Sequence, residues 1–140
     1  MFWFESETKG KKIKMIRHVL LIGLAGGLGT ILRYGVQQFA VILFGTSFPW
    51  GTFTVNMLGS FLFGLLVPFF TANLVSSEWR VIVLTGFLGG FTTFSSFAYD
   101  NVDLLQKSEN LSFIGNLTAQ NFCGIALVFL GLAVGHKYVS

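Results

Sequence analysis

The sequence predicts an all-α integral membrane protein with four transmembrane helices and a break in the third. Three observations predict this fold class. Of the 140 residues, 53% are hydrophobic and 11% are charged, whereas a soluble domain usually contains about 25% charged residues. The apolar residues are gathered in long runs rather than alternating with polar ones. The linkers between the runs are short, so no soluble domain fits among them.

Four apolar runs are long enough to cross a bilayer, because a helix needs roughly 20 apolar residues to span about 30 Å of hydrocarbon. They cover about residues 18–44, 51–75, 80–106 and 113–138. We therefore predict two parts, a basic N-terminal segment at residues 1–17 and a four-helix membrane domain at residues 18–140.

The basic segment contains Lys9, Lys11, Lys12, Lys14 and Arg17. Basic residues before an apolar stretch also occur in cleaved signal peptides. Here the apolar sequence continues past Arg33 to Phe44, which is the length of a full span. We therefore expect the first run to be a transmembrane helix.

Small residues recur four positions apart, a spacing that lets helix backbones approach closely in lipid, where van der Waals contact drives association. The pairs are Gly23/Gly27, Gly86/Gly90, Gly131/Gly135 and Ser60/Gly64. We predict that these faces pack against neighbouring helices, inside one bundle or in a dimer.

Polar side chains inside the runs are candidate functional groups, because they are costly at membrane depth unless they meet a partner or a wet cavity. Arg33 lies about halfway along the first run. It is either an anchor that reaches the interface or a group that attracts an anion to a vestibule. Asn56 in the second run, and Asn116 and Gln120 one turn apart in the fourth, either bond neighbouring helices or line a pore.

The third run contains the segment GGFTTFSSF at residues 89–97. Irregular backbone is tolerated at this depth only when it is buried in protein or lines a cavity. We predict a break at Gly89 and Gly90, where freed carbonyl oxygens could bind a small hard cation. Phe94 and Phe97 share a helix face, and their positive ring edges can partly replace water around an anion. Packing in the core or against lipid is the alternative for these two rings.

Other functional classes lack the residues that they need. A proton-coupled small multidrug exporter requires a carboxylate in the first span, and residues 18–44 contain none. A membrane enzyme requires a clustered nucleophile, base or metal ligands, which one Cys and two His do not supply. A purely structural subunit would not need the polar segment. We expect neither catalysis nor a nucleic-acid partner.

Three blocks, "GGLGTILRYG", "WGTFTVNMLGSFLFG" and "TGFLGGFTTFSSF", together resemble the Fluc family of fluoride channels in order and spacing, from about residue 18 onward. The resemblance implies a small channel that works as an antiparallel dimer with two fluoride pores. It also implies a structural sodium ion at the dimer interface, bound by the backbone carbonyls of Gly89 and Thr92.

The resemblance assigns three pore residues, Asn56, Phe94 and Phe97, and one vestibule residue, Arg33. The polar residues beside the two phenylalanines and one residue of the fourth run complete the predicted fluoride pore; they are Thr93, Ser95 and Ser96, and Gln120. The expected function is passive, electrogenic export of fluoride across the inner (plasma) membrane by a multi-pass, lipid-embedded channel, which gives fluoride resistance. A proton-coupled small multidrug exporter is the alternative.

The basic residues are divided unevenly between the two sides of the membrane. If four spans alternate in direction, the five basic residues of the N-terminal segment lie on the same side as Arg80 and Lys137, and only Lys107 lies on the other. By the positive-inside rule, both termini should be cytoplasmic. An antiparallel partner is then either the same chain inserted both ways, giving a homodimer, or a related chain of opposite orientation, giving a heterodimer.

Overall fold

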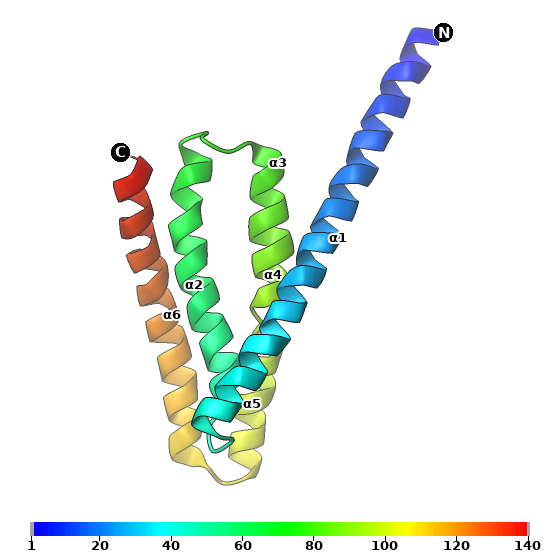
Figure 1. Ribbon diagram of the computed structural model, residues 1–140. Coiled ribbons are helices and arrows are strands. Elements are labelled where there is room, and N and C mark those ends of the chain that lie inside the picture. Colours follow the sequence, from blue (N-terminus) through cyan, green and yellow to red (C-terminus); the bar gives the residue numbers. More distant parts are fainter. Residues whose placement is uncertain (1, 140) are drawn as a thin grey trace.

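The computed structural model describes the backbone of residues 2–139 and the side chains of residues 10–139. These residues form helices and short turns, without strands. Four helical segments are long and apolar enough to cross a membrane: Gly10–Phe44, Trp50–Thr71, Ser77–Gln106 and Asn110–Val139. Figure 1 shows them side by side, with the third interrupted. The predicted all-α fold with four spans and a broken third helix is therefore confirmed.

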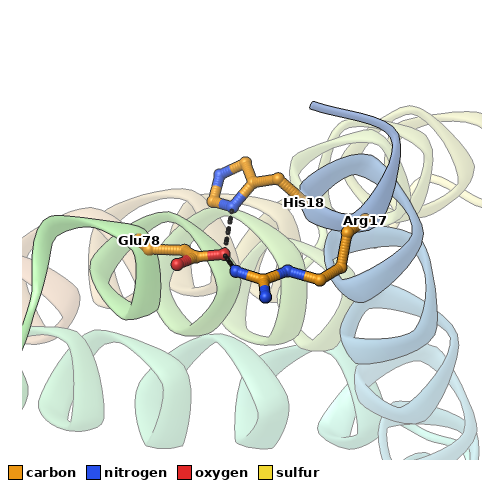
Figure 2. Close-up of polar contacts among 3 residues, drawn as sticks. All are labelled: Arg17, His18 and Glu78. Carbon is orange, nitrogen blue, oxygen red and sulfur yellow. Dashed lines mark hydrogen bonds and ion pairs between the residues drawn. The ribbon is translucent and has the colours of Figure 1, made fainter. Parts of the chain in front are cut away.

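The first helix, α1, runs from Phe2 to Phe44 without interruption, so the basic segment continues directly into the first span. Arg17 Nη2 donates to Glu78 Oε1 at 2.9 Å, which joins α1 to the start of the third span. His18 Nδ1 lies 3.6 Å from the same carboxylate oxygen, and Figure 2 shows the three side chains meeting there. The residues before Arg17 continue α1 by roughly 20 Å beyond this contact, at 1.5 Å per residue.

The second helix, α2 (Trp50–Thr71), ends four residues before the predicted boundary at 75. The cause is a helix-terminating turn in which Asn73 takes a left-handed conformation with φ of 57°. Leu74 N donates to Phe69 O at 3.1 Å and Asn73 N to Phe70 O at 3.3 Å. These two bonds cap the last carbonyls of the helix, as in a Schellman motif.

The third span consists of several pieces. A short α3 (Ser77–Arg80) leads into the π-helix η1 (Val81–Leu88), followed by α4 (Gly89–Phe91) and, after a gap, α5 (Phe94–Gln106). The break lies at Thr92 and Thr93, so its prediction at Gly89 and Gly90 was wrong. Gly90 lies within a helical piece, and its lack of a side chain allows close packing: a Cβ there would collide with the carbonyl of Gly26 on α1.

The fourth helix, α6 (Asn110–Val139), packs along α2 through small residues. A Cβ added at Gly64 would collide with the Val128 carbonyl, and one at Gly131 with the Phe61 carbonyl. The predicted packing role of these glycines is confirmed. In Figure 1 both termini and the α2–α3 turn lie at one end of the bundle, and the α1–α2 and α5–α6 turns lie at the other.

Glycines also determine how α1 packs on the third span. A Cβ added at Gly26 would lie 3.5 Å from the Gly86 carbonyl oxygen, which is ordinary van der Waals contact, and one at Gly29 would collide with the Phe87 carbonyl. By contrast, Gly23 and Gly27 meet nothing within 4 Å in the described part of the chain. That pair therefore does not pack within the chain, where the neighbouring face of α1 makes the contact, and its packing in a dimer stays a prediction.

Gly29→Ala should weaken the contact between α1 and the third span, because its methyl group would overlap a backbone carbonyl that cannot move aside easily. Overpacking of this kind costs about 1–3 kcal/mol. The measurement is the thermal melting temperature of the purified protein in detergent. Gly27→Ala is the matched control and should melt like wild type; equal melting of both variants would contradict this packing.

Candidate functional site

The break in the third span consists of two extended residues between helical pieces. Thr92 has φ −87° and ψ 162°, and Thr93 has φ −151° and ψ 113°. Thr93 is the N-cap of α5, and its hydroxyl accepts a hydrogen bond from Ser96 N at 3.2 Å. The same Oγ1 lies 3.2 Å from Ser95 Oγ and donates to Ser96 Oγ at 3.0 Å. The hydroxyl groups predicted to act here therefore form one cluster at the start of α5.

The backbone carbonyls of Gly89 and Thr92 are among those that lose their helical donors at this break. A continuous helix would join Thr93 N to Gly89 O and Ser96 N to Thr92 O, four residues back in each case. Thr93 N instead donates to Asn56 Oδ1 at 2.9 Å, and Ser96 N donates to the Thr93 hydroxyl. The oxygens of Gly89 and Thr92 are thereby released from the helix. Free carbonyl oxygens are suitable ligands for a hard cation such as sodium.

Polar side chains of α1 reach the break from one side. Arg33 Nη1 donates to Thr92 O at 3.2 Å, in a partly buried setting. Thr30 Oγ1 donates to Gly26 O at 2.9 Å and lies 3.5 Å from Gly90 O. Arg33 is thus directed at the middle of the third span, and its guanidinium supplies positive charge beside one of the freed carbonyls.

Asn56 on α2 holds the break from the other side. Its Nδ2 donates to Thr93 O at 3.1 Å while its Oδ1 accepts from Thr93 N. The side chain therefore replaces, for both polar groups of one residue, the bonds that a helix would have made. The second Nδ2 hydrogen bonds Gln120 Oε1 at 2.8 Å, so both donor hydrogens of Asn56 are in use.

From Gln120 the hydrogen bonds continue through two further buried amides. Gln120 Nε2 donates to Asn116 Oδ1 at 2.9 Å. Asn116 Nδ2 donates to Asn101 Oδ1 at 3.2 Å, and Asn101 Nδ2 donates to Phe97 O at 2.7 Å. We call these four side chains the amide relay: Asn56, Gln120, Asn116 and Asn101. The relay begins and ends on the first turn of α5, so it ties that turn to α2 and α6.

The two phenylalanines of this turn have different surroundings. Their ring centroids are 5.6 Å apart and the ring planes are inclined at 52°. Phe97 is 8% exposed and Phe94 is 78% exposed. The predicted pairing on one face is therefore present, with one ring in the core and the other on the outer surface of the described chain.

Two cavities adjoin the break. The larger, of about 360 Å³, extends from Asn56 past Gly89 and Thr92 to Val128. The smaller, of about 130 Å³, lies between α2, α5 and α6 beside Phe97 and Gln120. Both are lined by Asn56, Ser60 and Phe94. Their polar groups are neutral amides and hydroxyls, which can attract an anion without holding it as tightly as a fixed charge would.

A third cavity, of about 290 Å³, opens at the other end of α5 and is lined in part by Gln37, Trp50 and Asp100. Asp100 forms a side-chain hydrogen bond with Thr52, and its Oδ2 atom is buried without a hydrogen-bond partner among the described residues. Asp103, one turn later, is paired with Lys107 at 2.6 Å. This third cavity therefore carries acidic groups, which the break itself lacks.

The structure brings the predicted site residues together around the start of α5. Phe94 and Ser95 are exposed there. Asn116 is the exception, because its described contacts are with other amides of the relay rather than with a cavity. Asn101 was missed. Its position four residues after Phe97 could have indicated it, because residues at that spacing lie on the same helix face.

Asn101→Leu should destabilise the bundle, because it leaves the buried Asn116 amide without its acceptor. Leaving such a group unsatisfied costs about 1–3 kcal/mol. The measurement is the melting temperature in detergent. Asn121→Leu is the matched control, since the exposed Asn121 bonds only a carbonyl of its own helix. A wild-type melting temperature for Asn101→Leu would mean that the relay does not hold the bundle together.

Comparison with known proteins gives one family and a group of close relatives. A family model described as "CrcB-like protein, Camphor Resistance (CrcB)" matches residues 20–132. A protein of Rhizobium meliloti (strain 1021) named "Fluoride-specific ion channel FluC" is 42% identical over 120 residues, which is 85% of this chain and 96% of that protein. The matched residues 20–132 include the break and the whole amide relay.

Two further relatives carry the same name. The protein of Nitrosococcus oceani is 46% identical over 114 residues, covering 81% of this chain and 91% of the relative. The protein of Solidesulfovibrio magneticus is 42% identical over 122 residues, covering 86% of this chain and 98% of the relative.

Proposed function

The chain belongs to the CrcB-like family, and we propose that it is a fluoride-selective ion channel of the inner (plasma) membrane, which it crosses four times. Relatives named fluoride-specific ion channels are 42% and 46% identical over most of its length. The structural observation that carries the proposal is the interrupted third span, where amides, hydroxyls and aromatic rings adjoin two cavities.

The chemistry of this segment suits a small, strongly hydrated anion. Fluoride loses its water at a high cost in an apolar medium, so a pore must offer replacement donors along the way. Conduction also requires that each donor be weak enough for the ion to leave. Neutral amide and hydroxyl groups meet both needs, and the edges of phenylalanine rings carry partial positive charge. Flow is passive and electrogenic. The membrane potential therefore drives fluoride out of the cell, which gives fluoride resistance.

The alternative of a proton-coupled small multidrug exporter finds no support. The span Gly10–Phe44 contains no Asp or Glu, and none of the relatives described above bears an exporter's name.

Purified protein in liposomes tests the function directly. Fluoride efflux should begin when a potassium ionophore lets potassium leave with the anion and so prevents an opposing membrane potential. Chloride or a cationic drug should not move at a comparable rate. Absence of fluoride efflux would contradict the proposal.

Phe94→Ile and Phe97→Ile should each reduce fluoride efflux severely, by roughly tenfold or more, because an aliphatic side chain of similar bulk lacks the positive ring edge. Efflux from liposomes measured with a fluoride electrode checks this. Folding and dimer content, followed by size-exclusion chromatography, should stay at wild-type levels. Wild-type efflux from both single variants would show that the rings do not line the pore.

We also propose that a sodium ion is held by the backbone carbonyls of Gly89 and Thr92, together with the same atoms of a second subunit. The support is that both oxygens have lost their helical donors, because Asn56 and the Thr93 hydroxyl take the amides that would have bonded them. Arg33 uses one lone pair of Thr92 O, and a carbonyl has a second. When bound, the ion would supply fixed positive charge that offsets part of the cost of bringing an anion into the membrane.

Replacing sodium with N-methyl-D-glucamine should lower the melting temperature of the purified dimer, because the large cation cannot enter a carbonyl site. Thr92→Ser should keep both activity and the sodium effect, since it keeps the carbonyl and the hydroxyl that bonds Leu88 O at 3.0 Å. Thr92→Pro should abolish the sodium effect, because it removes the N–H that bonds the same carbonyl. Identical melting of wild type in both salts would contradict the sodium site.

For the assembly we propose an antiparallel dimer. The partner is either the same chain in the opposite orientation or a related chain. The uneven distribution of basic residues favours insertion of this chain with both termini in the cytoplasm. The common position of both termini and the α2–α3 turn at one end of the bundle is consistent with that count. If this orientation is the only one, the partner must be a different, related chain.

Reporter tags on the C-terminus should give signal only from the cytoplasmic side. Replacing Lys9, Lys11, Lys12 and Lys14 together by Gln should raise the fraction of chains with an external C-terminus, because it removes most of the charge bias. Equal signal from both sides in the wild type would instead mean dual insertion and a homodimer.

A further inference from the structure

Ser60 on α2 carries a hydroxyl group at the junction of the two cavities beside the break. The sequence indicates for it only a packing role, as the partner of Gly64 in a small-residue pair. In the structure Ser60 is partly buried and lines both the cavity of about 360 Å³ and the cavity of about 130 Å³. Only Asn56 and Phe94 share that position with it.

The Ser60 hydroxyl has no hydrogen-bond partner in the described part of the chain. Two other hydroxyls on α2 and α6 differ from it, because each bonds a carbonyl one turn back. Thr71 Oγ1 donates to Val67 O at 3.3 Å, and Thr118 Oγ1 donates to Ile114 O at 2.6 Å. Such back-bonding is the usual way in which a hydroxyl is satisfied inside a membrane helix. The donor of Ser60 is therefore available to something else.

The other polar residue at the junction cannot donate in the same way. Both Nδ2 hydrogens of Asn56 are used, by Thr93 O and Gln120 Oε1. Phe94 contributes a ring and no hydrogen-bond donor. Of the residues that line both cavities, Ser60 alone thus has a free donor, one turn after Asn56 on the same helix face.

The space in front of Ser60 is kept open by a glycine on α6. A Cβ added at Gly124 would lie 3.6 Å from Ser60 Oγ and 3.5 Å from Met57 Cε, which is ordinary van der Waals distance. A small side chain at position 124 would therefore fit, and the glycine leaves room there instead.

We propose that the Ser60 hydroxyl donates a hydrogen bond to fluoride as the ion passes from one cavity to the other. This makes Ser60 a fluoride-coordinating residue of the pore, and the inference rests on the proposed channel function. The hydroxyl receives a partner only while the ion is present. A bond of this kind between a neutral donor and a charged acceptor is stronger than one between neutral groups.

The test compares fluoride efflux from liposomes for wild type, Ser60→Ala and Ser60→Ala combined with Gly124→Ser. Ser60→Ala should reduce efflux about tenfold, which is the lower range expected for one lost bond to a charged group. The double variant should recover most of the efflux, because it returns a hydroxyl to the same space from the opposite helix. Thr71→Ala, which removes a back-bonded hydroxyl from the same helix, should conduct like wild type.

Melting temperature and dimer content are measured for every variant, because a merely structural role for Ser60 would lower them together with efflux. Wild-type efflux from Ser60→Ala overturns the inference, as does a loss of efflux matched by an equal loss of folded dimer. A loss that Gly124→Ser does not relieve also overturns it. Failure of the wild type to conduct fluoride is a different result, which contradicts the proposed function itself.

Discussion

The arrangement of this protein depends on one pair of hydrogen bonds, between the Asn56 side chain and the backbone N–H and C=O of Thr93. An extended stretch of backbone in hydrocarbon exposes polar groups, and each unsatisfied one costs several kcal/mol. Asn56 satisfies both groups of one residue at once. Because the Thr93 amide is bound in this way, the Gly89 carbonyl is released from the helix, and α5 can begin anew at Phe94.

The amide relay extends this single contact into the surrounding bundle. Asn116 is fully buried and Asn101 and Gln120 are nearly so, and each orients the next. The consequence is a polar core whose members are satisfied by one another. Mutual satisfaction limits the cost of burying them. It also fixes the turn that carries Phe94 and Phe97 against two other helices, so the rings are held by hydrogen bonds as well as by packing.

Close helix contacts create the setting in which these bonds can form. Gly90 lies against the backbone of Gly26, and Gly131 lies against that of α2. Larger residues at these points would collide with the facing backbone, so α1 and α6 could not lie as close to their neighbours. These glycines are thus required for close contact between helices, and not because they weaken a helix. The charges are distributed accordingly: one guanidinium lies beside the break, neutral donors surround it, and the carboxylates of Asp100 and Asp103 lie in the cavity at the other end of α5.

The fold class, the four spans, the segment in which the third span breaks and the family follow from the sequence alone, because hydrophobic run length and local motifs do not depend on distant contacts. The exact point in that segment where the helix opens depends on tertiary contacts. Glycine content indicated Gly89 and Gly90, but the backbone opens at Thr92 and Thr93, since Asn56, 37 positions away, binds there. Tertiary contacts also decide that α1 packs through Gly26 and Gly29, and that Asn101 joins the relay. Hydrogen-bond partners and helix faces are chosen by residues brought together only in the folded bundle, which no local pattern specifies.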